Sequence, residues 1–148
     1  MCKLKTQTPI VRTPSFVEQT ITSTELDEKL KALKVSMPLG LLDGQYYFTD
    51  LDGWLKIIWD LTFASSLYKA SRFDCDNYAF KAMNQCAERY GLNTMAYVSG
   101  NSPQGYHAFN MVYTGDEFLL FEPNNGFTWS GQLFPFGING YEPDTVLL

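Results

Sequence analysis

A cysteine between two acidic residues raises the first chemical question about this chain of 148 residues. Cys75 lies in the stretch SRFDCDNYAF, and the only histidine of the chain, His107, lies in GYHAFNMVYTG. A cysteine thiolate is a strong nucleophile, and an imidazole beside it can accept and donate the proton that its chemistry requires. Because the chain holds no second histidine, any thiol–imidazole chemistry in this protein must use His107.

A third side chain must hold the imidazole ring, and the hairpin expected after His107 offers two candidates. A tight turn at residues 114–115 places Glu122 directly opposite His107, whereas a turn one residue further along places Asn124 there. In the second register Glu122 lies on the diagonal of the same face, and a regular three-residue loop turns both candidates to the wrong face. We favour Glu122, because a carboxylate stabilises an imidazolium more than an amide does, with Asn124 as the alternative.

The position of Cys75 at the start of an expected helix bears on its reactivity. The partial positive charge of a helix N-terminus and a nearby imidazolium both lower the pKa of a thiol. Asp74 and Asp76 act in the opposite direction unless a cation neutralises them. Taken singly, these residues are typical of structural roles: a small apolar side chain, a hydrogen-bonded ring and helix caps. Their order along the chain favours a functional site.

Helices are expected in the first part of the chain and strands in the second. Thr24 and Thr49 are expected to begin two helices, and a third is expected from about Asp74 to Tyr90 with Gly91 as its C-cap. One face of the second helix is apolar and is expected to enter the core: Leu51, Leu55, Ile58, Trp59 and Thr62. Three later segments, LNTMAYVSG, GYHAFNMVYTG and EFLLFEP, alternate like strands, and DTVLL is expected to add a closing strand. Helices followed by antiparallel strands predict an α+β fold.

Length and composition bound the class of protein. The length predicts one domain over 1–148, divided into an N-terminal arm (1–20), a helical half (21–91) and a β half (92–148). The formal net charge of −5 and the lack of a basic stripe argue against nucleic acid as a partner. No apolar run is long enough for a membrane span and no secretory signal is visible, so we expect a cytoplasmic protein without a membrane partner.

The three cysteines, Cys2, Cys75 and Cys86, are an odd number at spacings unlike a disulfide scaffold or a zinc motif. Free thiols in a reducing environment are the simpler interpretation. Cys75 and Cys86 lie eleven residues apart, about three helical turns, so their sulfurs are too distant to share one zinc ion. Cys86 is therefore expected to be a core residue.

Two strings carry a resemblance to a known family. DCDNYA, which begins at Asp74, resembles the D-C-E/D-D-Y/F-A signature of bacterial transglutaminase-like cysteine proteinases, and HAFN at His107 resembles their histidine segment. A similar order of residues occurs in the protease domain fused to a mushroom lectin. The resemblance covers residues 68–126, and Asn77 departs from the acidic residue that is commoner in the signature. On these strings, the chain is similar to the papain-like, transglutaminase-like superfamily of cysteine enzymes.

The resemblance implies a papain-like/transglutaminase-like α+β fold, in which N-terminal helices pack on a C-terminal antiparallel β-sheet. It implies a cysteine hydrolase (a peptidase or amidase) that acts on a peptide or protein substrate through an acyl-enzyme, with Cys75, His107 and Glu122 as its triad. It also implies that Asp74 and Asp76 hold calcium, although the chemistry itself requires no cofactor. Hydrolysis and acyl transfer share the acyl-enzyme, and the sequence does not distinguish them.

The alternative is a catalytically inactive papain-like module that binds a ligand or assists another protein. The Cys75 backbone N–H could be one hydrogen-bond donor of an oxyanion hole. The second donor is not assigned, and Tyr68 and Gln45 are the two candidates for it. This unassigned donor and the small size of the chain favour the alternative. So does a group of aromatic residues that could lie at the surface, although packing in the core and on the sheet is the more ordinary role for them: Tyr46, Tyr47, Trp54, Trp129 and Tyr141.

Overall fold

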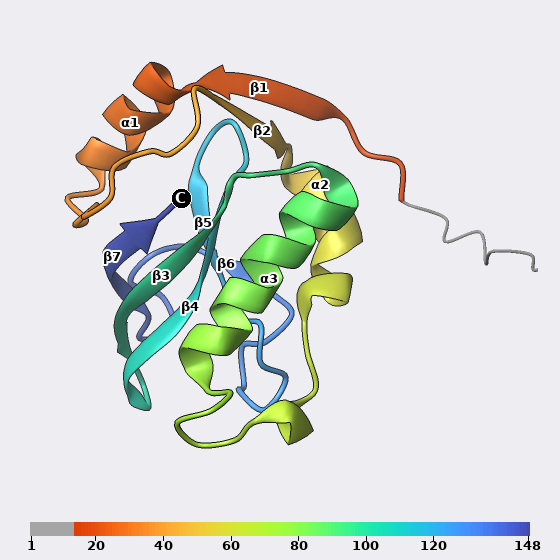
Figure 1. Ribbon diagram of the computed structural model, residues 1–148, viewed down its shortest axis with the longest axis vertical. Helices are drawn as coiled ribbons and strands as arrows, with labels where there is room; N and C mark the ends of the chain where they lie inside the picture. Colours follow the sequence, from red (N-terminus) through yellow and green to blue (C-terminus); the bar gives the residue numbers. More distant parts are fainter. Residues whose placement is uncertain (1–13) are drawn as a thin grey trace, which may run out of the picture.

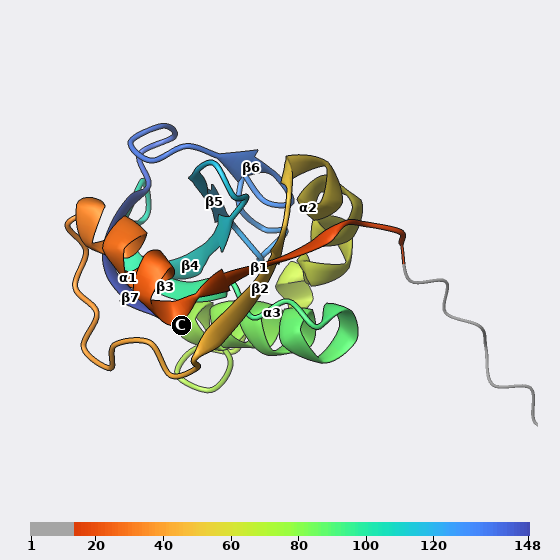
Figure 2. The same cartoon turned by 90° about the horizontal axis from the view of Figure 1, so that it is seen from above.

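Two antiparallel sheets organise the protein in the computed structural model, which describes residues 14–148 (Figure 1, Figure 2). The larger sheet has five strands in the order β6-β5-β4-β3-β7, and β1 pairs with β2 in a separate two-stranded sheet. Two 3₁₀ turns, η1 and η2, follow α2. The elements along the chain are β1 (Glu18–Thr22), α1 (Ser23–Ala32), β2 (Gln45–Thr49), α2 (Leu51–Ile57), η1 (Ile58–Leu61), η2 (Ser65–Leu67), α3 (Cys75–Tyr90), β3 (Met95–Ser102), β4 (Gly105–Tyr113), β5 (Phe118–Phe121), β6 (Leu133–Phe134) and β7 (Glu142–Leu147).

The expected order of N-terminal helices followed by strands is wrong. β1 precedes α1, and β2 separates α1 from α2, so the first half of the chain contains a sheet of its own. The strand sequences EQTIT and QYYFT are rich in β-branched and aromatic residues, which fit a pleated, half-buried surface. The described part of the chain is therefore rich in β-sheet, and it is not the papain-like set of N-terminal helices packed on a C-terminal sheet.

Several expectations about the chain as a whole are covered only in part. Residues 1–13 of the expected N-terminal arm, including Cys2, lie outside the described residues, whereas the last three residues of that arm, 18–20, belong to β1. Within residues 14–148, no helix combines the length and the apolarity that crossing a bilayer requires. The division into one domain and the cytoplasmic location stay predictions.

The first two helices begin at residues other than those expected. Thr22 rather than Thr24 caps α1, since its Oγ1 accepts a hydrogen bond from the Glu25 N–H at 3.3 Å, while Glu25 Oε2 accepts one from the Thr22 N–H at 3.1 Å. Asp50 caps α2 by accepting a hydrogen bond from the Gly53 N–H at 2.8 Å. Both caps satisfy N–H groups that a helix leaves without internal partners, and this local chemistry sets the true helix starts.

The third helix and the strands that follow it confirm the sequence pattern. α3 spans Cys75–Tyr90 and ends at Gly91, whose φ of 69° is the left-handed conformation that glycine adopts most readily. The helix lies along β3 and β4 (Figure 1) and buries Tyr78, Ala79, Ala82 and Cys86. The closing segment forms β7, which pairs with β3. Cys75, the first residue of α3, is thereby brought beside β4.

The larger sheet is covered on both faces, and alternate residues of β4 enter two cores. Phe109, Met111 and Tyr113 belong to one core, which α1, the two-stranded sheet and the C-terminal segment complete. Val112 belongs to the other core, which α2 and α3 complete. Almost every residue of β4 is buried as a result, which fixes the strand that carries His107.

The buried face of α2 is not the expected one. Trp54 is fully buried, whereas Leu51, Leu55 and Trp59 are exposed. α2 is only seven residues long and continues into the 3₁₀ turn η1, so positions inferred from a continuous helical period do not stay on one face. Trp54 instead reaches across the core, and its Nε1–H donates a hydrogen bond to the Tyr113 carbonyl at 2.8 Å.

Candidate functional site

Local hydrogen bonds hold Cys75 at the first position of α3. Asp74 is the N-cap: its Oδ2 accepts a hydrogen bond from the Ser71 N–H at 3.1 Å, and its own N–H donates to Asn77 Oδ1 at 3.1 Å. These bonds stabilise the turn that enters the helix. The free, half-buried thiol of Cys75 therefore lies at a helix N-terminus, where the helix dipole favours a thiolate.

His107 joins the thiol to a carboxylate. On one side, His107 Nε2 donates a hydrogen bond to Glu122 Oε2 at 2.8 Å, and both side chains are buried. On the other side, the ring lies close enough to Cys75 for the thiol and the imidazole to shift each other's pKa, and the Ala108 backbone also acts on the thiol. The ring packs against Phe127, with 4.6 Å between the ring centroids. The structure thus brings Cys75, His107 and Glu122 into one cluster.

These contacts favour the charged forms of the thiol and the imidazole. The hydrogen bond to His107 lowers the pKa of Cys75 below its ordinary value, and the Ala108 N–H adds to this, while burial and the Asp74 charge oppose it. Burial by itself lowers the pKa of His107, but the hydrogen bonds to Cys75 and Glu122 outweigh it and raise that pKa to about 9. The arrangement can therefore hold a thiolate–imidazolium pair near neutral pH.

The register of the β4–β5 hairpin explains why Glu122 reaches the ring. Tyr113 pairs with Phe118, which sets His107 level with Asn124 and leaves Glu122 on the diagonal. Asn124 does not bond the ring: its backbone N–H donates to Glu122 Oε1 at 3.0 Å, and its side chain accepts from a loop N–H. β5 ends at Phe121, and Glu122, directly after it, bonds the ring from this diagonal position.

Tyr141 is the site residue that the sequence pattern does not identify. Its burial agrees with the core packing expected for this group of aromatic residues: it is 1% exposed, and its hydroxyl donates a hydrogen bond to Glu122 Oε2 at 3.1 Å. It lies 34 residues after His107 in a Gly- and Pro-rich segment without periodicity. No local signal marks it, because the contact depends on where β7 joins the sheet.

Neither candidate for the second oxyanion donor bonds the cluster in the part of the chain that the structure describes. Gln45 lies in β2, where its carbonyl accepts a hydrogen bond from Asn93, just beyond the C-terminal end of α3. Cys75 opens that helix, and its 16 residues correspond to roughly 24 Å. Tyr68 follows η2 with its side chain 53% exposed.

Asp74 and Asp76 lie together beside the thiol, within 4.8 Å of one another and of the Cys75 sulfur. A hydrogen bond with Asp74 raises the pKa of Asp76, and burial adds to this effect, so the two carboxylates share a proton more readily than two separate ones. Calcium takes six to eight oxygen ligands, and two carboxylates beside a soft thiol are a poor fit. The expected calcium site stays a prediction, and the roles proposed for Cys75, His107 and Glu122 do not require a metal ion.

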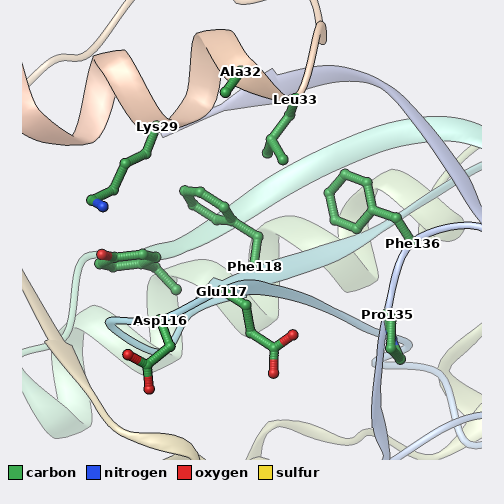
Figure 3. Close-up of a pocket in the computed structure, with 9 residues that line it drawn as sticks. Lys29, Ala32, Leu33, Asp116, Glu117, Phe118, Pro135 and Phe136 are labelled. Carbon is green, nitrogen blue, oxygen red and sulfur yellow. The ribbon is translucent and has the colours of Figure 1, made fainter.

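A separate cavity of about 490 Å³ lies between α1 and the β4–β5 hairpin (Figure 3). Leu33, Phe118 and Phe136 form an apolar wall, and Asp116 and Glu117 place carboxylates at its edge (Figure 3). Its remaining lining residues are Lys29, Ala32, Tyr113 and Pro135. This cavity has no local signature in the sequence, because its walls come from three segments that only the fold brings together.

Comparison with known proteins shows the fold. No family model matches the chain, and no curated protein matches it. One similar solved structure is described as a PSL1a–E64 complex, with a TM-score of 0.64, 20% sequence identity and coverage of 87% of this chain and 51% of that chain. Another is Polyporus squamosus lectin bound to the human-type influenza-binding epitope Neu5Acα2-6Galβ1-4GlcNAc, with a TM-score of 0.61, 19% identity and coverage of 87% and 49%. This chain spans about half the length of each, and at these identities the likeness shows the fold alone.

The resemblance to papain-like and transglutaminase-like cysteine proteinases is corrected by this finding. One of these structural neighbours is described as a lectin, and neither is described as a hydrolase, a cysteine protease or a thiol protease. A peptide substrate is likewise unsupported. The string that carried the resemblance has a local cause, since Asp74 and Asn77 form the capping box of α3. The geometry of Cys75, His107 and Glu122 is unaffected by this correction, and their roles are proposals.

Proposed function

We propose that this chain is a binding module and that its ligand is a carbohydrate. The fold that it shares with a lectin bound to a sialylated trisaccharide supports this ligand class. The observation that carries the proposal for this chain is the cavity between α1 and the β4–β5 hairpin, which combines aromatic rings with carboxylates. Binding sites of this kind are concave and mostly apolar, with a few polar groups that fix the orientation of the ligand.

The chemistry of the cavity suits a sugar ring. A pyranose has C–H-rich faces and a rim of hydroxyl groups, so it needs an apolar surface and hydrogen-bond acceptors together. Phe118 and Phe136 provide aromatic faces, and Asp116 and Glu117 accept hydrogen bonds from hydroxyls. Lys29, whose Nζ lies 6.0 Å from the Tyr113 ring centroid, adds a donor and a positive charge.

Isothermal titration calorimetry tests the proposal with the trisaccharide Neu5Acα2-6Galβ1-4GlcNAc and with its neutral disaccharide portion as separate probes. Phe136→Ala and Glu117→Gln should each weaken binding at least about tenfold, because each removes one of the two required contacts. Glu88→Gln, an equivalent change at an exposed position on α3, is the matched control and should leave affinity unchanged. No binding of either probe by the unmodified chain, or equal affinity in all three variants, contradicts the proposal.

A second candidate function rests on the position of His107 between Cys75 and Glu122: an activated thiol that forms a covalent adduct with an electrophilic ligand. The Cys75 thiolate would donate its electron pair to an electrophilic carbon and a C–S bond would form. The bond to the displaced group would break with its electrons on that group, which departs or, if a second bond joins it to the ligand, stays part of the adduct. The His107 imidazolium would supply a proton to a basic leaving group. The fold shared with PSL1a, which is described in complex with E64, makes E64 a second probe.

Mass spectrometry of the full chain in a Cys2→Ser background measures this reactivity at pH 7. Iodoacetamide should alkylate Cys75 at least about tenfold faster than free cysteine, with iodide as the leaving group, and His107→Asn should remove the acceleration. Cys86 is the internal control, since burial raises the pKa of its thiol. E64 should add its mass at Cys75. Labelling of Cys75 no faster than that of free cysteine would show that the thiol is not activated.

A further inference from the structure

We propose that Tyr141 is a positioning residue for the Cys75–His107–Glu122 cluster, and that its hydroxyl holds the Glu122 carboxylate against the imidazole. The inference rests on the activated thiol proposed above. Tyr141 touches neither sulfur nor any reacting atom, so it acts through Glu122. It precedes β7, whereas Glu122 follows β5, and their contact joins two segments that are distant along the chain.

The hydrogen bonds of Glu122 allow its carboxylate one orientation. The side chain is 0% exposed, so bulk solvent does not reach its oxygens. Oε2 accepts from His107 Nε2 at 2.8 Å and from the Tyr141 hydroxyl at 3.1 Å. Oε1 accepts from the Asn124 N–H at 3.0 Å. With Tyr141 and Asn124 holding one oxygen each, the carboxylate faces the ring without rotating.

The ring of Tyr141 is fixed independently of its hydroxyl. It packs edge-to-face on Phe109 and on Phe134, with 5.1 Å between ring centroids in each case. Burial raises the pKa of Tyr141, and the Glu122 charge adds to this, so the hydroxyl stays protonated and donates. Tyr141→Phe therefore removes one donor from Glu122 and leaves the aromatic packing in place.

The titratable groups that face His107 are Cys75 from α3, Glu122 from the segment after β5, and Tyr141 from the segment before β7. The other rings against it, Phe109 and Phe127, carry no charge. A Glu122 carboxylate with one donor fewer is less stable as an anion and freer to rotate. The rotation weakens the ion pair with the imidazolium and lowers the pKa of His107, whereas the lost donor by itself leaves more charge on Oε2 and acts the other way. A lowered pKa of His107 is therefore the result that a positioning role of Tyr141 requires.

The single histidine makes the test unambiguous, because the only imidazole signals in the NMR spectrum of the full chain belong to His107. Tyr141→Phe should lower the titration midpoint of His107 by at least about half a pH unit, a roughly threefold change in its acid dissociation constant. Tyr46→Phe is the matched control, since Tyr46 is equally buried and its hydroxyl bonds the Asp43 N–H instead. It should leave the midpoint unchanged.

A double-mutant cycle separates a positioning role from a general loss of packing. In a Glu122→Gln background, Tyr141→Phe should have no further effect on the His107 midpoint. An unchanged midpoint in Tyr141→Phe, or an equal shift with and without Glu122, would overturn the inference. Failure of the activated thiol is a different result: the unmodified chain would then show no accelerated alkylation of Cys75, whatever residue 141 is. If Tyr141→Phe is unfolded by circular dichroism, the hydroxyl is shown to maintain the fold, and the inference is also rejected.

Discussion

His107 is the side chain through which a thiol and a carboxylate influence each other. Its pKa, raised to about 9, keeps the ring charged through neutral pH, and the charged ring in turn lowers the pKa of the Cys75 thiol. The two shifts have opposite signs and define one pH window. Within it, above the lowered pKa of Cys75 and below about 9, thiolate and imidazolium exist together.

The pH dependence of Cys75 alkylation follows from these signs. Because the pKa of Cys75 is lowered, the rate of its reaction with iodoacetamide should begin to rise at a lower pH than the rate for free cysteine. The thiol of free cysteine has a pKa of about 8.5. His107→Asn should move the rise back toward that value. Rates measured by mass spectrometry between about pH 5 and pH 10 check this, since the two limits bracket the expected window. Superimposable profiles for the unmodified chain and His107→Asn would contradict it.

At the scale of elements, α3 positions Cys75 because local contacts define both ends of the helix. Hydrogen bonds to the larger sheet hold one side of it. Asp74 caps the start, and Gly91 ends the helix with a left-handed backbone. Along its flank, Asn110 of β4 donates hydrogen bonds from Nδ2 to the Ala79 carbonyl of α3 at 2.9 Å and to the Ala96 carbonyl of β3 at 3.0 Å. These bonds fix the helix relative to the strand that holds His107.

Substitution of the C-cap glycine tests how much the end of α3 contributes. Gly91→Ala should lower the free energy of unfolding by about 1 kcal/mol, because a Cβ is strained at a φ of 69°. Steric contact is not the cause, since the closest atom to an added Cβ is 3.9 Å away. Gly44→Ala, where φ is not positive and the space is open, is the control and should be neutral or slightly stabilising. Urea denaturation measures both, and equal effects would contradict the argument.

At the scale of the whole molecule, the larger sheet separates two hydrophobic cores, and Trp54 connects elements across one of them. Trp54 is 0% exposed among residues of α2, α3 and the sheet, and its indole N–H bonds the end of β4. Trp59, five residues later, is 66% exposed. The two tryptophans differ in burial although they are close neighbours in sequence.

Replacement of each tryptophan should distinguish the effect on stability of a core side chain from that of a surface side chain. Trp54→Ala should destabilise the domain by about 3–5 kcal/mol, through lost apolar burial and the cavity that remains. Trp59→Ala should change stability by less than about 0.5 kcal/mol. Urea denaturation followed by far-ultraviolet circular dichroism measures both, and similar losses would contradict the described burial. If Trp54→Ala does not fold, Trp54→Phe should fold with a smaller loss.

Local features were predictable from the sequence because nearby residues cause them. The bounds of α3, its Gly91 cap and the strands after it follow from spacing and capping within a few residues. Cys75, His107 and Glu122 could be predicted as a set for a related reason. The chain has one histidine, and a hairpin allows few registers of its two strands. The resemblance built on DCDNYA failed as a guide to the protein class, because a helix start produces much of that string by itself.

The sequence by itself therefore determined α3, the strands β3 to β5, the closing strand β7 and which imidazole a thiol must use, but not β6. Only the tertiary structure decided that β1 and β2 form a second sheet, that Glu122 rather than Asn124 meets the ring, and that Tyr141 supports Glu122. These contacts join segments that are far apart in the chain. They depend on the residues at which the paired strands end and on how the two cores pack. Short-range patterns carry no information about such distances, so the geometry of the site appears only when the whole chain has folded.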